Sequence, residues 1–350
     1  MAGRDMGRGK ARNRANRPPD IHAVARHAGV SHQTVSRVLN EHPNVRASTR
    51  ARVREAMAVL GYTPNVVARA LITGRSRTLG LIVLNEELHG PASALRAIEQ
   101  DARAAGYGLR IIHLSAVARS TLPDVVDSLQ RQLVEAVLII DPHPEDQVLL
   151  APVPSGLALV TVGGLHSEGV PGVSYDSGPG VAQALEYLLG LGHETVHHVA
   201  GPGGWSESDV RRDAWRDTLQ RAGRPVPEPV EGDWTARSGY RAGRVLRERP
   251  GLTAVFAGND QMALGLLYAF AEAGIPVPAQ VSVIGFDDVP DAAYYQPSLT
   301  TLRQDFGELG RHAVELALRQ IAAGTRQGIG GFTLPPPSLI LRASAAPPPR

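Results

Sequence analysis

Residues 21–40 have the sequence IHAVARHAGVSHQTVSRVLN, which predicts two short amphipathic helices joined by a turn. Asp20 can accept hydrogen bonds from the first free N–H groups of one helix, and Ser31 can do so for the next. Gly29 supplies the turn between them. We expect these residues to point inward: Ile21, Val24, Ala25, Ala28, Val35, Val38 and Leu39. The stretch is therefore predicted to be a helix-turn-helix.

The polar residues of the second helix are of the types that contact base edges in DNA. Gln pairs with adenine and Arg with guanine in the major groove, and both types occur here as Gln33 and Arg37. His32 and Ser36 lie on the same outward face. A buried helical hairpin with a solvated polar face is the competing interpretation. The spacing and the flanking charge favour a DNA-binding head.

Charge is divided unevenly along the chain, although the formal net charge of its 350 residues is only +2. Residues 1–77 contain 15 Lys and Arg against 4 Asp and Glu, whereas the remainder contains 21 against 30. A basic head on an acidic body is expected when one segment neutralises phosphates and the rest must not bind them. Residues 1–17 resemble a disordered basic arm, or else an over-long start that precedes the real beginning at Met6 or later.

Length and composition limit the class of the remaining chain. With 43% hydrophobic residues it can bury two or more cores beyond the head. The absence of cysteine excludes disulfides and thiolate metal sites, and the scattered histidines predict no metal and no cofactor. Without a signal-peptide apolar region or an apolar run near 18 residues, we expect a cytoplasmic, nucleoid-associated protein with no membrane contact.

A third helix is predicted over 47–60, and Gly61 ends it. Its inward stripe consists of Val53, Ala56, Met57 and Leu60. The head is therefore expected to span 18–63. Residues 64–77 are expected to form a hinge and linker that becomes helical only against a partner, because so short a segment is marginal alone.

From Leu79 onward, short β-rich apolar runs alternate with amphipathic stretches. The candidate strands are 79–84, 109–114, 134–140, 157–162, 195–201, 253–258 and 281–286. The candidate helices are 92–105, 178–191, 209–222, 237–248, 261–273 and 306–323. Continuous apolar strands separated by helices predict parallel sheets covered on both faces. The strands divide into two α/β lobes with a boundary near Tyr175 to Gly180.

Seven motifs appear in order along the chain: AGVSHQTVSRVLN (28–40), YTPNVVARAL (62–71), LGHETVHHVAGP (191–202), EGDWTARSGY (231–240), GNDQMALG (258–265), GFDD (285–288) and SLTTLRQDFGELG (298–310). From Asp20 to about Arg342 the chain thereby resembles the LacI/GalR family of transcriptional regulators. The resemblance implies an all-α helix-turn-helix head and an α/β periplasmic-binding-protein-like core of two parallel-sheet lobes.

In that family a ligand cleft lies between the lobes and three strands cross it. The resemblance thus places lobe 1 at about 78–176 and 304–333, and lobe 2 at about 177–303 and 334–343. A Pro-rich tail is expected at 344–350.

The resemblance further implies a homodimer that reads two half-sites of a pseudo-palindromic operator in double-stranded DNA. It assigns DNA contacts to His22, Ser31, His32, Gln33, Thr34, Ser36, Arg37, Asn40, Thr49, Tyr62, Asn65, Ala68 and Leu71. Leu71 is expected to wedge between base steps in the minor groove, with ordinary linker packing as its alternative.

The same resemblance assigns effector contacts to Leu88, His89, Gly90, Pro91, Val162, Trp205, Arg211, Trp234, Asn259, Asp287, Gln304 and Phe306. Arg211 would hydrogen-bond a polar ligand, with Arg212 as its rival. Trp234 offers a flat face to the C–H side of a sugar ring. Asn259 and Asp287 would fix its hydroxyl groups.

Each of these assignments has a structural alternative. Trp234 could be a core aromatic, Asp287 a helix cap, and Asn259 with Asp260 a turn pair. Trp205 either covers the cleft and stacks on a sugar or packs on the surface.

Three departures separate this chain from the family member that it resembles most. Val162 stands where that protein has an aspartate in its sugar site, which puts the identity of the effector in question. His32 replaces a tyrosine of the recognition helix, so the operator is expected to be related but different. The Pro-rich end cannot form the apolar heptad helix used there for tetramers, so we expect a dimer.

These observations predict a repressor, not an enzyme, that a galactoside or related glycoside releases from its operator. In some family members the ligand instead promotes DNA binding. The Leu88–His89 loop favours sugars over purines, because a nucleobase needs an aromatic sandwich. The alternatives are a hydrolase that uses Asp260 with Asp287 and Asp288, and a sugar-binding transport protein. Adjacent residues at one strand end point in opposite directions, which disfavours the hydrolase.

Overall fold

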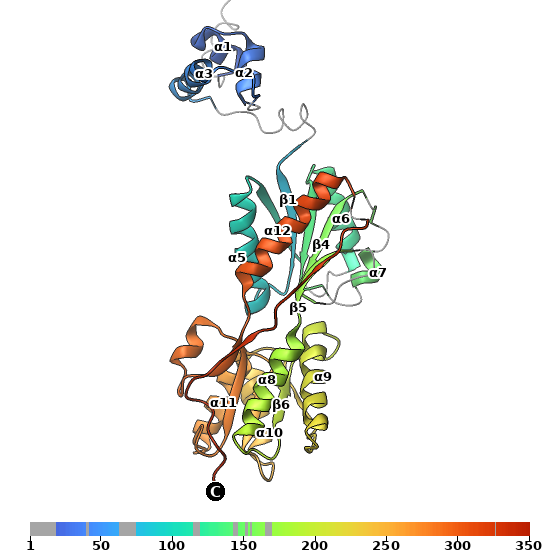
Figure 1. Ribbon diagram of the computed structural model, residues 1–350, viewed down its shortest axis with the longest axis vertical. Coiled ribbons are helices and arrows are strands. Elements are labelled where there is room, and N and C mark those ends of the chain that lie inside the picture. Colours follow the sequence, from blue (N-terminus) through green and yellow to red (C-terminus); the bar gives the residue numbers. More distant parts are fainter. Residues whose placement is uncertain are drawn as a thin grey trace, which may run out of the picture. The chain divides into compact units, whose positions relative to one another are not determined.

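The computed structural model in Figure 1 describes residues 19–39, 42–62, 75–114, 120–142, 146–150, 153–154, 156–164, 170–325 and 327–350. Two compact units divide the chain, one over residues 1–76 and one over 77–350. The basic arm expected at 1–17 and the DNA contacts expected at Asn40, Asn65, Ala68 and Leu71 lie outside the described residues.

The head contains three helices: α1 (Ile21–Ala28), α2 (His32–Leu39) and α3 (Ala47–Leu60). The local signals act as predicted. Asp20 Oδ1 accepts a hydrogen bond from Ala23 N over 2.8 Å, and Ser31 Oγ accepts one from Thr34 N over 3.2 Å. Gly29 ends α1 in the left-handed conformation with φ 61°. The head core is confirmed as Val24, Ala25, Ala28, Val35, Val38, Val53 and Ala56, with Ile21, Leu39, Met57, Leu60 and Tyr62 packed against it.

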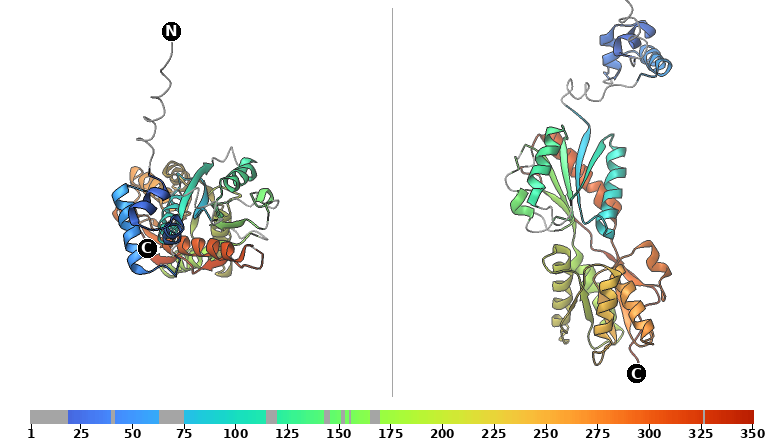
Figure 2. Two further views of the ribbon diagram at one scale, coloured as in Figure 1. Left: turned by 90° about the horizontal axis from the view of Figure 1, so that it is seen from above. Right: turned by 180° about the vertical axis from the view of Figure 1, so that it is seen from behind.

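The first sheet of the core has the strand order β11-β5-β4-β3-β1-β2, and neighbouring strands are parallel. Its strands are β1 (Thr78–Leu84), β2 (Gly108–Leu114), β3 (Ala136–Ile140), β4 (Ala158–Val162), β5 (Gly172–Tyr175) and β11 (Phe332–Leu334). Alternate residues of β1 face opposite ways, since Leu81 packs with α5 (His89–Ala104) and α12 (Phe306–Ala323), whereas Ile82 packs with α6 (Leu122–Arg131) and α7 (Asp146–Leu150). Helices thus cover both faces of this sheet (Figure 2).

The second sheet has the order β12-β10-β9-β8-β6-β7, with β12 antiparallel to β10. Its strands are β6 (His197–Ala200), β7 (Val230–Glu231), β8 (Ala254–Ala257), β9 (Ser282–Asp287), β10 (Thr300–Arg303) and β12 (Ser338–Ile340). Its helices are α8 (Ser177–Gly190), α9 (Ser206–Arg221), α10 (Ala236–Leu246), α11 (Asp260–Glu272) and a 3-10 turn at Pro290–Tyr294. Phe256 packs against α8 and α9, and its neighbour Val255 packs against α10 and α11. The expected two-lobe α/β core is confirmed.

The chain passes between the two sheets at three places: after Tyr175, between Arg303 and Phe306, and between Leu334 and Ser338. The tail differs from the expectation, because the boundary placed before Ser344 is too early. Ser344 is fully buried, donates through Oγ to Val283 O and accepts from Thr300 N. Ala346 also bonds Ser282 and His193, so the second lobe continues at least this far.

Several elements are absent from the sequence prediction, namely β5, β7, β10, β11, β12, α6 and α7. The strands among them have two to four residues, too few for a periodic signal. Within the described ranges, none of the helices has the length and apolar character needed to span a bilayer. The same ranges hold no group of three or more His, Cys, Asp or Glu arranged to bind a metal ion.

Candidate effector cleft and DNA-reading face

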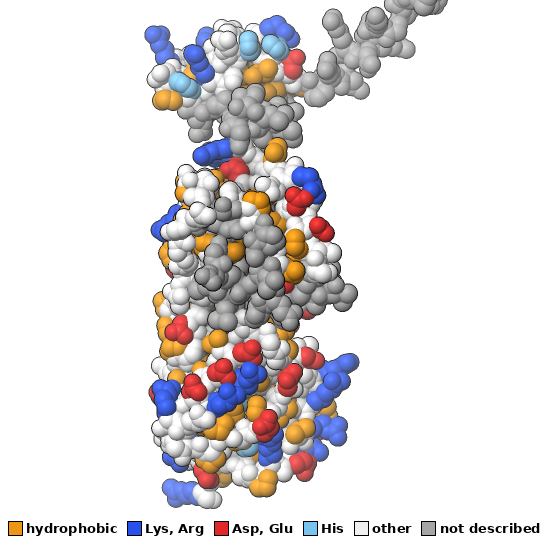
Figure 3. Space-filling model, turned by 90° about the vertical axis from the view of Figure 1, so that its right-hand side faces the viewer, with side chains coloured by type: hydrophobic (Ala, Val, Ile, Leu, Met, Phe, Trp, Pro, Cys, Tyr) orange, Lys and Arg blue, Asp and Glu red, His pale blue; other side chains and the backbone are white. Residues whose placement is uncertain are grey.

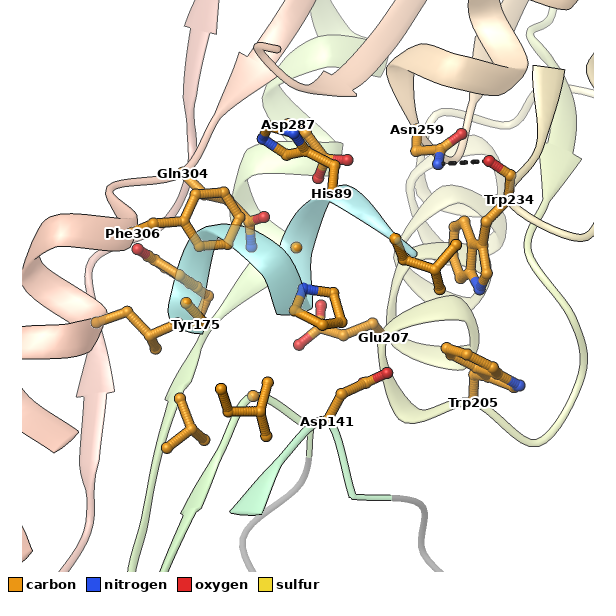
Figure 4. Close-up of a pocket in the computed structure, with 18 of the residues that line it drawn as sticks. His89, Asp141, Tyr175, Trp205, Glu207, Trp234, Asn259, Asp287, Gln304 and Phe306 are labelled. Carbon is orange, nitrogen blue, oxygen red and sulfur yellow. Dashed lines mark hydrogen bonds between the residues drawn. The ribbon is translucent and has the colours of Figure 1, made fainter. Parts of the chain in front are cut away.

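A pocket of about 670 Å³ lies between the two sheets of the core, at the carboxyl ends of their strands (Figure 4). Open α/β sheets bind ligands at this edge. The pocket wall contains every residue predicted to contact the effector: Leu88, His89, Gly90, Pro91, Val162, Trp205, Arg211, Trp234, Asn259, Asp287, Gln304 and Phe306. The structure therefore brings the predicted set together from both lobes.

Seven further lining residues were missed: Ala94, Ile140, Asp141, Gly163, Tyr175, Glu207 and Leu309. Two of them carry signals that could have found them. Asp141 directly follows the apolar strand that ends at Ile140, and Glu207 precedes Arg211 by one helical turn.

Arg211, and not its neighbour Arg212, faces the pocket. The Arg211 guanidinium is 6% exposed and donates to Gly258 O over 2.6 Å, with Glu207 Oε2 3.4 Å from its other terminal nitrogen. Its Cζ lies 3.6 Å from the centre of the Phe286 ring. Arg212 instead pairs with Asp209 over 2.6 Å. The rotation between adjacent residues of a helix thus directs Arg211 into the cleft and Arg212 away from it.

Trp234 is both a core aromatic and a wall of the pocket. It is 5% exposed, packs in the lobe 2 core and has a left-handed backbone with φ 67°. Its ring lies against Gly201, where an added Cβ would come within 2.1 Å of Trp234 Cζ2. Its buried Nε1 has no hydrogen-bond partner among the described residues.

Trp205 adds a second indole to the same end of the pocket. Its ring centre lies 6.1 Å from that of Trp234, with the planes inclined at 61°. It immediately precedes α9 and is half-buried. Of the two positions expected for Trp205, the structure has the one in which it lines the cleft.

Asn259 has a local structural role that the turn-pair alternative anticipated. Its Oδ1 accepts from Met262 N over 2.9 Å and so caps α11. Its Nδ2 donates to Trp234 O over 3.0 Å. Asn259 therefore anchors the segment that carries the indole.

Asp287 and Asp288 have different surroundings, and both have a positive φ, 108° and 53°, so their separation is not the alternation of an extended strand. Asp287 lines the pocket, and burial raises its pKa to about 7 although Arg211 opposes the rise. Asp288 forms ion pairs with Arg303 and Arg342 over 2.5 and 2.6 Å. The two carboxylates do not share a site.

Asp260 is fully buried and does not line the pocket. Its two oxygens accept from the Thr301 hydroxyl over 2.5 Å and from Val289 N over 2.9 Å. Burial, followed by the charge of Asp287, raises the pKa of Asp260 to about 8. A hydrolase would need its two carboxyl groups in one pocket. Asp260 and Asp288 do not line this pocket and therefore do not supply them.

The first-lobe wall differs locally from the expectation. His89, Gly90 and Pro91 form the first turn of α5, so only Leu88 of the expected Leu88–His89 loop precedes the helix. The His89 ring packs edge-on to Phe306 with centres 5.7 Å apart, and burial lowers the pKa of this histidine. Tyr175 donates a hydrogen bond to Asp305 O, and its ring also packs edge-on against Phe306. Gln304 lies on the same segment, which crosses between the lobes.

In the head, His22, Ser31, His32, Gln33 and Arg37 are exposed. The rings of His22 and His32 lie 5.2 Å apart. Of the other predicted contacts, Thr34, Ser36, Thr49 and Tyr62 are half-buried, and Tyr62 packs on the head core. Arg and His side chains are visible on the surface of the head in Figure 3. The helix α2 thus presents Gln33 and Arg37 to an external partner.

Comparison with known proteins yields matches along nearly the whole chain. Residues 20–65 match the model of bacterial regulatory proteins of the lacI family, and residues 185–345 match a periplasmic binding protein-like domain. The lactose operon repressor of Escherichia coli (strain K12) is 33% identical over 95% of this chain and 92% of its own.

Two solved structures are also similar. The lac repressor dimer bound to operator and the anti-inducer ONPF has a TM-score of 0.84 and 31% identity, and the match covers 94% of this chain and 100% of that one. The complex of the transcriptional regulator CelR with cellobiose has a TM-score of 0.69 and 29% identity, with 93% and 99% covered.

Proposed function

Because this chain belongs to the lacI family of bacterial regulatory proteins and is a DNA-binding transcriptional repressor, we propose that a small carbohydrate in the interlobe cleft controls its binding to an operator. The observation that carries this proposal is the composition of the cleft wall. Trp234 supplies a flat apolar face, and Asp287 lies in the same wall with a carboxylate that can accept hydrogen bonds. A sugar ring has an apolar C–H face and a rim of hydroxyl donors, so it matches both.

The ring geometry of the cleft favours a sugar over a purine. A planar base is held best between parallel aromatic faces. The aromatic pairs in the wall are instead inclined, by 61° for Trp205 and Trp234 and by 74° for His89 and Phe306. We therefore propose a galactoside or a related glycoside. Two relatives, a lactose operon repressor and a regulator bound to cellobiose, point to the same class.

The cleft couples to DNA binding because both lobes contribute to it. His89 and Phe306 come from the first lobe, and Arg211, Trp234 and Asp287 from the second. A ligand that prefers one lobe arrangement shifts the equilibrium by its differential affinity. We propose that the carbohydrate-bound arrangement holds the operator more weakly.

The operator-bound species is proposed to be a homodimer. One small head buries too little surface for specific affinity, whereas a two-fold pair reads two half-sites of a pseudo-palindrome. Gln33 and Arg37 are exposed on α2 and are the proposed base-reading residues, with His32 beside them.

Fluorescence anisotropy tests the proposal with the full chain and a DNA fragment from its own promoter region. A panel of galactosides and glucosides should lower operator affinity. Asp287→Ala and Arg211→Ala should abolish that response and leave operator binding without sugar nearly unchanged. Arg212→Ala is the matched control, because Arg212 pairs with Asp209 outside the cleft wall, and it should keep the response. Sugar responses retained in both cleft variants would place the effector elsewhere.

A chromogenic glycoside provides a separate check on the class of protein. A repressor binds it without turnover. Steady hydrolysis by the purified chain would instead support the hydrolase.

A further inference from the structure

Acidic groups outnumber basic ones in the cleft wall. Asp141, Glu207 and Asp287 line it, whereas Arg211 is the one Lys or Arg among the described lining residues. His89 adds little positive charge, because burial lowers its pKa. We propose that the cleft selects its effector by charge, with Glu207 and Asp141 on opposite lobes admitting uncharged glycosides and excluding sugar acids and sugar phosphates. This inference rests on the proposed function, because it specifies the chemical class of the ligand for the same cleft.

Glu207 occupies the position where a helix would otherwise attract an anion. It lies in the first turn of α9, and Figure 4 shows its side chain reaching into the cavity. The free N–H groups at a helix N-terminus favour negative charge nearby. Here the protein supplies that charge itself. Glu207 Oε2 also accepts a hydrogen bond from Ser177 Oγ over 3.1 Å, which helps to hold the carboxylate in place.

Asp141 brings a second carboxylate from the other lobe. It follows β3 directly, and Asn85 Nδ2 donates to its Oδ2 over 3.2 Å. Figure 4 shows the Asp141 side chain directed into the same cavity as Glu207. A ligand between the lobes is therefore flanked by Glu207 and Asp141 on its two sides. Asp287 at the end of β9 adds a third carboxyl group, which is partly protonated at neutral pH because burial raises its pKa to about 7.

The arginine of the cleft is already engaged by the protein. Its terminal nitrogens lie 2.6 Å from Gly258 O and 3.4 Å from Glu207 Oε2, and its face covers Phe286. The buried donors without a partner in the described part of the cleft wall are single N–H groups, Arg211 Nε and Trp234 Nε1. Single N–H donors and carboxylate acceptors suit hydroxyl groups, whereas a phosphate or carboxylate is bound best by a cation or by several converging N–H groups.

The expected penalty for an anionic ligand follows from these charges. Placing like charges together in the cleft weakens binding, whereas hydroxyl groups gain charge-assisted hydrogen bonds to the same carboxylates. Size alone would exclude a bulky phosphate too. A test of charge therefore needs ligands of equal shape.

Methyl β-galactoside and methyl β-glucoside each provide such a set. In each series the C6 alcohol is compared with the C6 uronic acid and with the amide of that acid, by calorimetry on the full chain at neutral pH. The acid and its amide have nearly the same shape and differ in charge. In the series that binds, we expect the alcohol and the amide to bind with similar affinity and the acid at least about tenfold more weakly.

Two variants assign the discrimination to named residues. Glu207→Gln and Asp141→Asn should each reduce severalfold the ratio of the affinity for the amide to the affinity for the acid. Asp141→Asn does so without removing a contact of Arg211. Asp213→Asn is the control, since Asp213 lies on the same helix, is exposed and pairs with Arg216. It should leave the ratio unchanged.

The outcomes separate this inference from the proposed function. If the acid binds within about threefold of the amide, or if both variants keep the full ratio, charge selection is overturned while the carbohydrate effector stands. If no member of either series binds, the proposed function itself is contradicted, and this inference, which rests on it, is contradicted too.

Discussion

The side-chain amide of Asn259 donates a hydrogen bond to the main-chain carbonyl of Trp234 over 3.0 Å. The two residues are 25 positions apart, and the bond joins the cap of α11 to a residue in a left-handed conformation. A non-glycine residue in that conformation carries strain, so it persists where its surroundings hold it. The orientation of the indole in the cleft therefore depends on Asn259.

Replacing Asn259 separates these two roles. Asn259→Ala removes the helix cap and the bond to Trp234, and we expect it to lower the free energy of unfolding by about 1–3 kcal/mol. Asn259→Ser keeps a capping oxygen without the donor to Trp234. It should recover part of the stability but leave sugar affinity as weak as in the alanine variant. Urea unfolding and calorimetry measure the two effects, and full recovery of affinity in the serine variant would show that the bond to Trp234 does not matter.

Gly201 sets the depth of the tryptophan in the cleft wall. Because an added Cβ would lie 2.1 Å from Trp234 Cζ2, Gly201→Ala must displace the ring. We expect sugar affinity to fall at least about tenfold and stability by about 1–3 kcal/mol. Gly190→Ala is the matched control, because a Cβ there meets nothing within 4 Å, and it should preserve the sugar response. Anisotropy with operator DNA and sugar measures the response. An unaffected Gly201→Ala variant would contradict this view of the wall.

The buried carboxyl of Asp260 predicts that stability falls as pH rises. Burial raises its pKa from 3.8 to about 8, so the folded state binds its proton more tightly than the unfolded chain does. That contribution is complete below pH 3.8 and is lost as pH rises through about 8. The window from pH 7 to 9 lies above the titration of buried His197 and His198, whose pKa values burial lowers to about 4.

Urea unfolding at pH 7 and pH 9 checks this dependence. Asp260→Asn should lower the slope, because an amide can take the place of the neutral acid beside Val289 N and the Thr301 hydroxyl. The slope that remains belongs in part to Asp287, whose pKa burial raises to about 7. The control Asp124→Asn changes an exposed carboxylate and should keep the full slope. A slope as steep in Asp260→Asn as in the unchanged chain would assign the effect to another group.

Arg37 is predicted to read one base pair in each half-site. Arg37→Ala should cost about 1–3 kcal/mol per base contact and relax the preference at that position. Arg52→Ala should instead weaken binding to all sequences alike, as expected for a phosphate contact. Anisotropy on a set of single-base operator variants measures both. If the ranking of operators is the same with and without Arg37, the recognition helix is misassigned.

Quaternary state provides an independent prediction. Ser344 and Ala346 are bound to the second lobe, and the prolines at positions 347, 348 and 349 do not suit an apolar heptad helix. Sedimentation of the full chain at micromolar concentration should show a homodimer. A stable tetramer without DNA would contradict it.

The head and the lobe elements were predictable because their signals are local. Asp20, Gly29 and Ser31 act on backbone groups within a few residues of themselves. The helix predicted over 306–323 from its apolar spacing begins and ends at the same residues as α12. The effector residues carried over by resemblance also line one pocket. Short strands such as β11 and β12 were not predictable, since three residues carry no periodicity and form only by pairing with distant strands.

The chemistry of the cleft required the folded chain. Periodicity could not separate Arg211 from Arg212, because adjacent residues of a helix point in directions that differ by a fixed rotation. Which of the two directions faces the cleft depends on how the helix packs in the folded chain. Asp141 and Glu207 lie 66 positions apart in the sequence, one after β3 of the first lobe and the other on α9 of the second, so no spacing relates them. Local propensity specifies where helices and strands begin and end, whereas sheet order and packing specify which of their side chains share a pocket. The presence of these two carboxylates in one pocket is a result of that packing.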